Sequence, residues 1–241
     1  MANPILNDNF AAQERVYEGE AMTVNGTIQI AGFLGILLVA AAAYVWSRFN
    51  MGFTDQAYML TSVGAIAGFV LALIISFTRK KFLVPVYAVA EGLCLGGISA
   101  VFEQSYHGIV VQAVAGTFAA LFSMLILYRA NIIKCSDKFR SVIFISTCSI
   151  AVIYLVDLIG HFFHYAVPII NTSSGLGIGF SAIVVVIAAL NLIIDFDFIE
   201  QGARNMLPKD MEWYGAFGLM VTLVWLYLEI LRLLAKLQDR K

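Results

Sequence analysis

The chain has 241 residues and a net charge of −1, and 61% of its residues are hydrophobic while only 13% are charged. Soluble domains carry roughly 25% charged residues, so the composition excludes an ordinary soluble domain. The near-neutral charge also excludes a protein drawn to nucleic acid by its electrostatic field. Apolar runs of about 20 residues, the length that crosses a bilayer, recur along the chain and predict a multi-pass membrane protein.

Residues 1–27 form a polar and acidic stretch, without the basic leader and apolar core of a signal peptide. We therefore expect the first hydrophobic segment to remain in the mature protein. The predicted domains are a polar cytoplasmic N-terminal tail, 1–27, and a transmembrane domain, 28–241. The three cysteines, Cys94, Cys135 and Cys148, show no Cys-x-x-Cys spacing, which predicts neither a disulfide framework nor a thiolate metal site.

Seven apolar runs, joined by short connections, predict an all-α membrane protein with a single membrane domain. The predicted spans are Ile28–Ser47, Ala57–Phe77, Val84–Phe102, Ile109–Tyr128, Ser141–Phe163, Leu176–Gln201 and Met211–Leu237.

Basic residues concentrate in the loops that follow the second, fourth and sixth spans, and short loops rich in Lys and Arg stay in the cytoplasm. These residues are Arg79, Lys80, Lys81, Arg129, Lys134, Lys138, Arg140, Arg204 and Lys209. The rule places the N-terminus and these loops inside. The basic residues Lys236, Arg240 and Lys241 after the last span oppose that orientation, which leaves a re-entrant last span open.

Small residues recur every fourth position in the second and third spans. They are Gly64, Gly68 and Ala72, then Gly92, Gly96 and Ala100. Small residues at this spacing let helix backbones approach each other in lipid, so we expect these two spans to pack closely.

Acidic residues within apolar runs are the candidate functional groups, because a charge at the bilayer centre costs roughly 2.5–3.5 kcal/mol on insertion scales. They are Glu91, Asp157, Asp195, Asp197 and Glu229. Asp197 is close to the end of the sixth span and is expected to be hydrated. Glu200, beside it, is expected to pair with Arg204 along the helix.

Asp157 precedes two histidines, His161 and His164, at one-turn spacing. This spacing suits a metal, but an interfacial aromatic belt is favoured because no further ligands are evident.

Asp195 and Glu229 are the acids least easily explained as surface groups. Glu229 can pair with Arg232 along its own helix. It can instead meet Asp195 on the preceding span, but only if the last span begins near Phe217. A span that begins at Met211 would place the two acids at depths about 13 Å apart.

Three stretches resemble a known family. "ALNLIIDFDFIEQGA", "WLYLEILRLLAKL" and "EGLCLGGISAVFE" are similar to bacterial Bax-inhibitor/YccA-like proteins, the transmembrane Bax-inhibitor-motif group. The resemblance implies a seven-transmembrane-helix bundle with a central last helix, in the bacterial cytoplasmic (inner) membrane. It also implies a calcium leak controlled by pH, in which two acids on the last two helices share a proton.

On the matching positions of this chain, the resemblance makes Asp195 and Glu229 the proton-sharing pair and the transient calcium ligands. It makes Arg79 the latch that holds the closed state. We treat Asn191, Asp197 and Glu91 as accessory residues. Glu229 departs from the family, which commonly has Asp there, and the second span lacks an acid that some members carry.

The function that the resemblance implies is therefore a pH-sensitive calcium leak. Its pH dependence has a physical basis, because two carboxylates in hydrogen-bond range cannot both ionise cheaply. The expected partners are the lipid bilayer, calcium ions and protons. We expect neither enzymatic activity nor a tightly bound cofactor.

Three other functions compete with this prediction. One is a non-conducting membrane regulator that modulates a membrane-bound protease through the polar tail. Another is a small-solute transporter, although no inverted repeat is visible. An intramembrane aspartyl protease is rejected, since Tyr154 is not adjacent to Asp157, and Phe180 follows the Gly-x-Gly run.

Overall fold

The computed structural model describes residues 20–163, 170 and 172–240, and in these ranges every extended regular element is an α-helix. The predicted histidine pair lies outside the described residues, because His164 is not among them and the side chain of His161 is not described. The helices are α2 (Val24–Asn50), α3 (Thr54–Thr78), α4 (Leu83–Ser105), α5 (Ile109–Arg129), α6 (Asp137–Phe162), α8 (Gly175–Arg204) and α9 (Met211–Asp239).

Within the described residues, seven helices are long and apolar enough to cross a membrane, which confirms the predicted all-α membrane fold. The helices coincide with the predicted spans to within a few residues. Helix α9 is continuous over 29 residues from Met211, a length of about 44 Å, and it exceeds the roughly 30 Å of a bilayer core. Helix α9 therefore begins before Phe217 and shows no break at which the chain could turn back.

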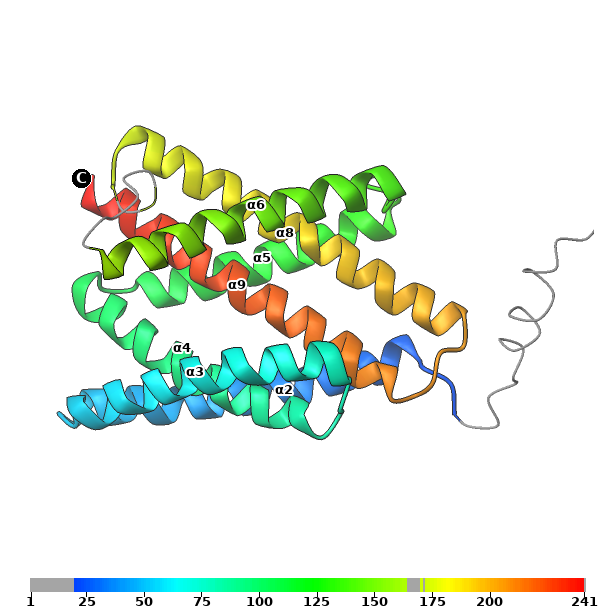
Figure 1. Cartoon of the computed structure of the whole chain (residues 1–241), viewed down its shortest axis with the longest axis horizontal. Helices are drawn as coiled ribbons and strands as arrows, with labels where there is room; N and C mark the ends of the chain where they lie inside the picture. The colour runs from blue at the N-terminus through cyan, green and yellow to red at the C-terminus, as the bar shows by residue number, and fades with distance from the viewer. Residues whose placement is uncertain (1–19, 164–169, 171, 241) are drawn as a thin grey trace, which may run out of the picture.

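Helix α9 lies in the middle of the bundle, as the family resemblance implied. Figure 1 shows it running diagonally between α2, α3 and α4 on one side and α5, α6 and α8 on the other. It contacts α2 and α4 on the first side and α5 and α8 on the second. Helix α4 is also enclosed, since it packs against α2, α3, α5 and α9.

Glycines allow α4 to pack directly against backbone. A Cβ on Gly92 or Gly96 would collide with the carbonyl oxygens of Leu38 or Ala42 on α2. On the α3 side, a Cβ on Gly64 would lie 2.6 Å from the carbonyl oxygen of Ala90. The predicted close packing through small residues is therefore present.

One end of the bundle gathers the loops that carry the basic residues, and we call it the basic end. Lys81, after α3, forms an ion pair of 2.7 Å with Asp210, just before α9. Ala21, just before α2, forms an isolated β-bridge with Pro208. At the opposite end, Asp239 accepts hydrogen bonds from Tyr106 and from Ser173.

Candidate functional site

Asp195 on α8 faces α9 with one carboxylate oxygen unsatisfied. The residue as a whole is half-buried, but its Oδ2 atom is covered and has no hydrogen-bond partner among the described residues. Its Oδ1 atom lies 3.7 Å from where a Cβ on Gly218 of α9 would be. The Thr222 side chain, one turn further along α9, interacts with the same carboxyl group. Among the described residues, no cationic side chain is paired with this carboxyl group.

Glu229 on α9 is in the opposite situation, because its buried carboxylate is surrounded by donors. Its side chain is 2% exposed, and Arg232 Nη1 lies 3.2 Å from Oε1. The Tyr154 hydroxyl of α6 donates within 2.9 Å of both oxygens. Trp225 Nε1 donates at 3.3 Å. The guanidinium of Arg232 also lies 4.9 Å from the centre of the Tyr154 ring. We call these four residues the Glu229 network.

The predicted proton-sharing pair of Asp195 and Glu229 is not formed in this structure. Asp195 is level with Gly218 on α9, and Glu229 lies about three turns, or about 16 Å, further along that helix. The physical reason is the early start of α9 at Met211, which carries Glu229 past the depth of Asp195. The alternative expectation, that Glu229 pairs with Arg232 along its own helix, describes the structure.

Arg79 does not contact either acid, so its predicted role as a latch on Asp195 is not seen. Its guanidinium instead lies 5.4 Å from the ring centre of Tyr214 on α9. Tyr214 lies one turn closer to the basic end than Gly218, which is level with Asp195. Arg79 therefore makes a cation–π contact with Tyr214 in place of the predicted contact with Asp195.

Four aromatic rings lie around the first two turns of α9, and we call them the aromatic cluster. The ring centres of Tyr87 and Phe217 are 5.0 Å apart. Tyr214 lies 6.1 Å from Phe217 and 6.0 Å from Phe198 on α8. The cluster occupies the space between Asp195 and the basic end of the helices.

Asp197 was expected to be hydrated, and that expectation is wrong because α5 and α6 cover it. Its side chain is 12% exposed and forms an ion pair with Arg140 of α6. It also accepts hydrogen bonds from Gln201 at 2.9 Å and from Tyr128 of α5 at 3.3 Å. Asp197 therefore ties α8 to its two neighbours. The predicted pair of Glu200 and Arg204 is present at 2.5 Å.

The remaining accessory residues lie away from Asp195. Asn191 donates from Nδ2 to the Thr147 hydroxyl of α6 and to the Ile187 carbonyl, both at 2.9 Å. Glu91 of α4 is half-buried against α3, where a Cβ on Gly68 would lie 2.8 Å from its Oε1. Neither side chain joins Asp195 in a common site.

The end of the predicted tail, Glu20–Thr23, is bound to the loop between α8 and α9, and we call it the strap. Met22 N donates to the Leu207 carbonyl at 2.7 Å, and Lys209 N donates to the Glu20 carbonyl at 3.1 Å. The buried Met22 side chain occupies the space in front of Gly202 and Gly215. Helix α2 begins at Val24, earlier than the predicted boundary at residue 28.

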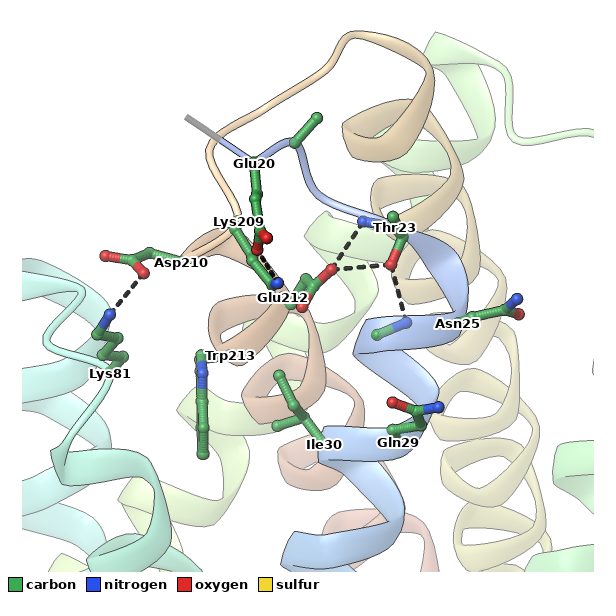
Figure 2. A pocket seen from close by; sticks show the side chains of 12 residues that line it. Glu20, Thr23, Asn25, Gln29, Ile30, Lys81, Lys209, Asp210, Glu212 and Trp213 are labelled. Atoms are coloured by element: carbon green, nitrogen blue, oxygen red, sulfur yellow. Dashed lines mark hydrogen bonds and ion pairs between the residues drawn. The ribbon is translucent and has the colours of Figure 1, made fainter. Parts of the chain in front are cut away.

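Glu212, on the first turn of α9, holds the strap to the start of α2. It is buried and accepts hydrogen bonds of 2.9 Å from both the backbone N–H and the hydroxyl of Thr23. That hydroxyl in turn accepts from Gly26 N as the N-cap of α2. Figure 2 shows these contacts beside a pocket of ≈ 640 Å³. The carboxylate of Glu20 has its pKa lowered by Lys209, which donates to it.

The sequence did not reveal Tyr154 and Arg140 as partners of Glu229 and Asp197, nor Glu212 as the residue that holds the strap. Arg140 was counted only as a basic loop residue, and Tyr154 was considered only as a protease motif. Their roles depend on which faces of α6, α8 and α9 meet, and a single sequence carries no local signal for that. A tyrosine within an apolar run is the one hint available, because its hydroxyl needs a partner when buried.

A calcium site is not preassembled by these acids. Within the described ranges, no group of three or more His, Cys, Asp or Glu side chains is placed to hold a metal ion. Asp195 and Glu229, predicted as transient calcium ligands, lie at different depths and cannot chelate one ion together. A cation that passes either acid would meet one carboxylate at a time.

Comparison with known proteins identifies one family. A family model described as "Bax inhibitor 1 like" matches residues 3–239, nearly the whole chain. No curated protein matches the chain.

Proposed function

This chain belongs to the Bax inhibitor 1-like family, and from that premise we propose that it is a pH-sensitive calcium leak. In the proposal, Asp195 is the proton-responsive group and the structure described here is the closed state. The protein lies in the bacterial cytoplasmic membrane with its basic end inside, as the positive-inside rule favours.

The observation that carries the proposal is the unsatisfied Oδ2 atom of Asp195. A carboxylate without a partner in apolar surroundings is costly, so the group either holds a proton or attracts a cation. Protonation and cation binding therefore compete at this one side chain. Carboxylate oxygen is also the ligand that calcium prefers. A single acid is a weak site, which suits an ion that must leave again.

In the proposed closed state, the aromatic cluster blocks the ion path between Asp195 and the basic end. Tyr214 and Phe217 lie one turn or less from the level of Asp195, on the side of the basic end. Arg79 covers Tyr214 and adds a positive charge to the same exit. In the proposed opening, loss of the proton from Asp195 draws in a cation and loosens the contact of α8 with α9. The rings then separate.

Glu229 has a different role in this proposal from the one expected of a proton-sharing pair. Its charge is offset by Arg232, and its oxygens are occupied by Tyr154 and Trp225. It therefore fixes α6 to α9 and does not gate. The gate depends on one titrating acid and has no shared proton.

The test is calcium flux into liposomes that contain the purified chain, measured across pH. Asp195→Asn is expected to abolish the pH dependence, because the amide has no proton to lose in this range. The matched control, Asp55→Asn, removes an exposed carboxylate at the start of α3 and is expected to leave the pH dependence intact. The proposal fails if Asp195→Asn conducts with the pH profile of the unchanged chain.

A second candidate is the non-conducting regulator of a membrane-bound protease or another partner, acting through the N-terminal tail. The strap favours it, because Met22 in front of Gly202 and Gly215 mechanically joins the tail to α8 and α9. Met22→Ala separates the two candidates. A non-conducting regulator would lose its effect on the partner and would show no flux with or without the substitution, whereas a leak would show altered flux with no partner present.

A further inference from the structure

A groove runs between α6 and α8 on the outside of the bundle, starting near the basic end. Its volume is ≈ 400 Å³. It is lined by Arg140, Ser141, Phe144 and Thr147 of α6 and by Asn191 and Ile194 of α8. It lies apart from the strap and from the facing surfaces of α8 and α9 that hold Asp195.

The groove exists because α6 is the most loosely packed helix. Helix α8 is the only helix with which it makes extensive contact in the described structure. Of the α6 side chains that the structure describes, only Ile143 and Ile150 are buried. In a membrane, lipid fills an opening of this kind on the surface of a helix bundle. The question is whether the lining prefers one lipid.

The groove is polar and cationic at one end and apolar further in. Arg140 is 40% exposed and lies level with Asp197, to which its Nη2 donates. Its Nε donates to Cys135 Sγ at 3.3 Å, whereas its Nη1 donates to no group among the described residues. Arg140 lines the groove, so a guanidinium that keeps free N–H donors lies at this end of it. Ser141, beside it, donates its hydroxyl to the Asp137 carbonyl and keeps lone pairs free.

The loop above the groove adds positive charge. Lys134 lies within it, Arg129 ends α5 and Lys138 lies in the first turn of α6, and Asp137 is the one acid between residues 129 and 140. Basic pockets between transmembrane helices on the cytoplasmic side are recognition sites for anionic lipid headgroups. Asp197 offsets the charge of Arg140, and Glu200 is paired with Arg204. The balance at this end of the groove is still positive and complements a phosphodiester.

Deeper in, the lining suits an acyl chain. Phe144 is about 6 Å below Arg140 along α6 and faces Ile194 across the groove. The floor is the hydrogen bond from Asn191 to Thr147, which satisfies both side chains without a ligand donor. Along the groove, the charged and hydroxyl groups of Arg140 and Ser141 come first, and the apolar side chains of Phe144 and Ile194 follow. This is the order of the headgroup and the acyl chains in a phospholipid.

We propose that this groove is a specific site for an anionic phospholipid of the leaflet at the basic end. Its phosphodiester accepts hydrogen bonds from Arg140 Nη1, and one acyl chain lies against Phe144 and Ile194. The bound lipid supplies the packing that α6 lacks. The proposal is independent of the calcium leak, since it involves neither Asp195 nor ion flux.

The experiment is native mass spectrometry of the purified full chain in detergent, with equal amounts of phosphatidylglycerol and phosphatidylcholine added. The unchanged chain is expected to retain phosphatidylglycerol preferentially. Arg140→Gln is expected to lower that retention about tenfold, as the loss of one charge-assisted hydrogen bond predicts. Arg129→Gln, which removes a charge at the end of α5 outside the groove, is expected to retain the lipid.

A second variant separates lipid binding from folding, because Arg140→Gln also breaks the ion pair with Asp197. Ser141→Trp fills the groove from an exposed position and leaves that pair intact. It is expected to lower retention to the same degree. The proposal is overturned if Ser141→Trp binds as the unchanged chain does, or if both lipids are retained equally.

Location is tested with phosphatidylglycerol that carries a photoreactive diazirine on one acyl chain. Crosslinks are expected on the peptides that contain Phe144 or Ile194. Crosslinks confined to other helices would overturn the assignment to this groove.

Discussion

The two acids of the α8–α9 hairpin that sequence reasoning treated as partners occupy environments of opposite kind. Near the basic end, Asp195 has a covered oxygen without a partner and is bounded by the aromatic cluster. In the second half of α9, Glu229 is held by an arginine, a tyrosine and a tryptophan. The comparison shows that the role of an acid in an apolar helix depends on the side chains that face it. A satisfied acid stabilises the fold, and an unsatisfied one is available for chemistry.

The largest expected effect on stability comes from removing the satisfied acid. Glu229→Leu leaves Arg232 without its counter-charge and takes away the acceptor for Tyr154 and Trp225. Removal of one partner from a buried ion pair costs about 3–5 kcal/mol. The free energy of unfolding, measured by denaturant titration in micelles, should fall by that amount. Glu229→Gln is the control, and it should lose less because the amide oxygen still accepts from Tyr154.

Removing one donor from the Glu229 network should have the next largest effect. Tyr154→Phe keeps the ring that stacks with Arg232 but leaves the carboxylate without its hydroxyl donor. Loss of a hydrogen bond to a buried charged group costs about 1–3 kcal/mol. The same titration measures it, with the exposed Tyr58→Phe as control. An unchanged unfolding free energy would show that Glu229 does not depend on α6.

The unsatisfied acid should contribute little to stability. Asp195→Asn keeps the shape of the side chain and breaks no ion pair, so the unfolding free energy should stay within about 1 kcal/mol of that of the unchanged chain. A loss as large as that of Glu229→Leu would mean that Asp195 is a structural residue. That result would erase the contrast between the two acids.

The smallest effect concerns the strap, whose ion pair is exposed. Lys209 lowers the pKa of Glu20 from its ordinary value of 4.5. The contribution of this pair is therefore fully present above that value and is lost as the pH falls through the lower folded value. The hydrogen-exchange protection of the Met22 amide should decrease in acid over this range. Glu20→Gln should remove the pH dependence, and a decrease that persists in this variant would point to another group.

Much of the architecture was predictable from hydropathy and small residues. The apolar runs located the helices, and Gly92 and Gly96 marked α4 as a closely packed helix, although they did not identify α2 as the helix it packs against. The central position of α9 came from the family resemblance and not from periodicity. Each of these signals is local in the sequence or carried by a motif, so one chain is enough to reveal it.

The candidate site was only half predictable, for a geometric reason. Asp195 was identified from the sequence as an acid without an easy surface role, but its pairing required the depth of α9 relative to α8. That depth depends on six residues of connection and on the strap, which no pattern specifies. Arg79 was likewise placed on the correct side, but the identity of its contact, Tyr214, depends on the rotation of α9.

The direct contact of α4 with the backbones of α2 and α3 has a mechanical consequence. An interface formed by main-chain atoms contains no side-chain rotamers that could rearrange, so we expect these three helices to move as one rigid unit. Helices α5, α6 and α8 meet their neighbours through long side chains, so we expect these helices to shift more easily. We expect changes in bilayer thickness or lateral pressure to be absorbed on that side, and helix α6 to be the first element to tilt.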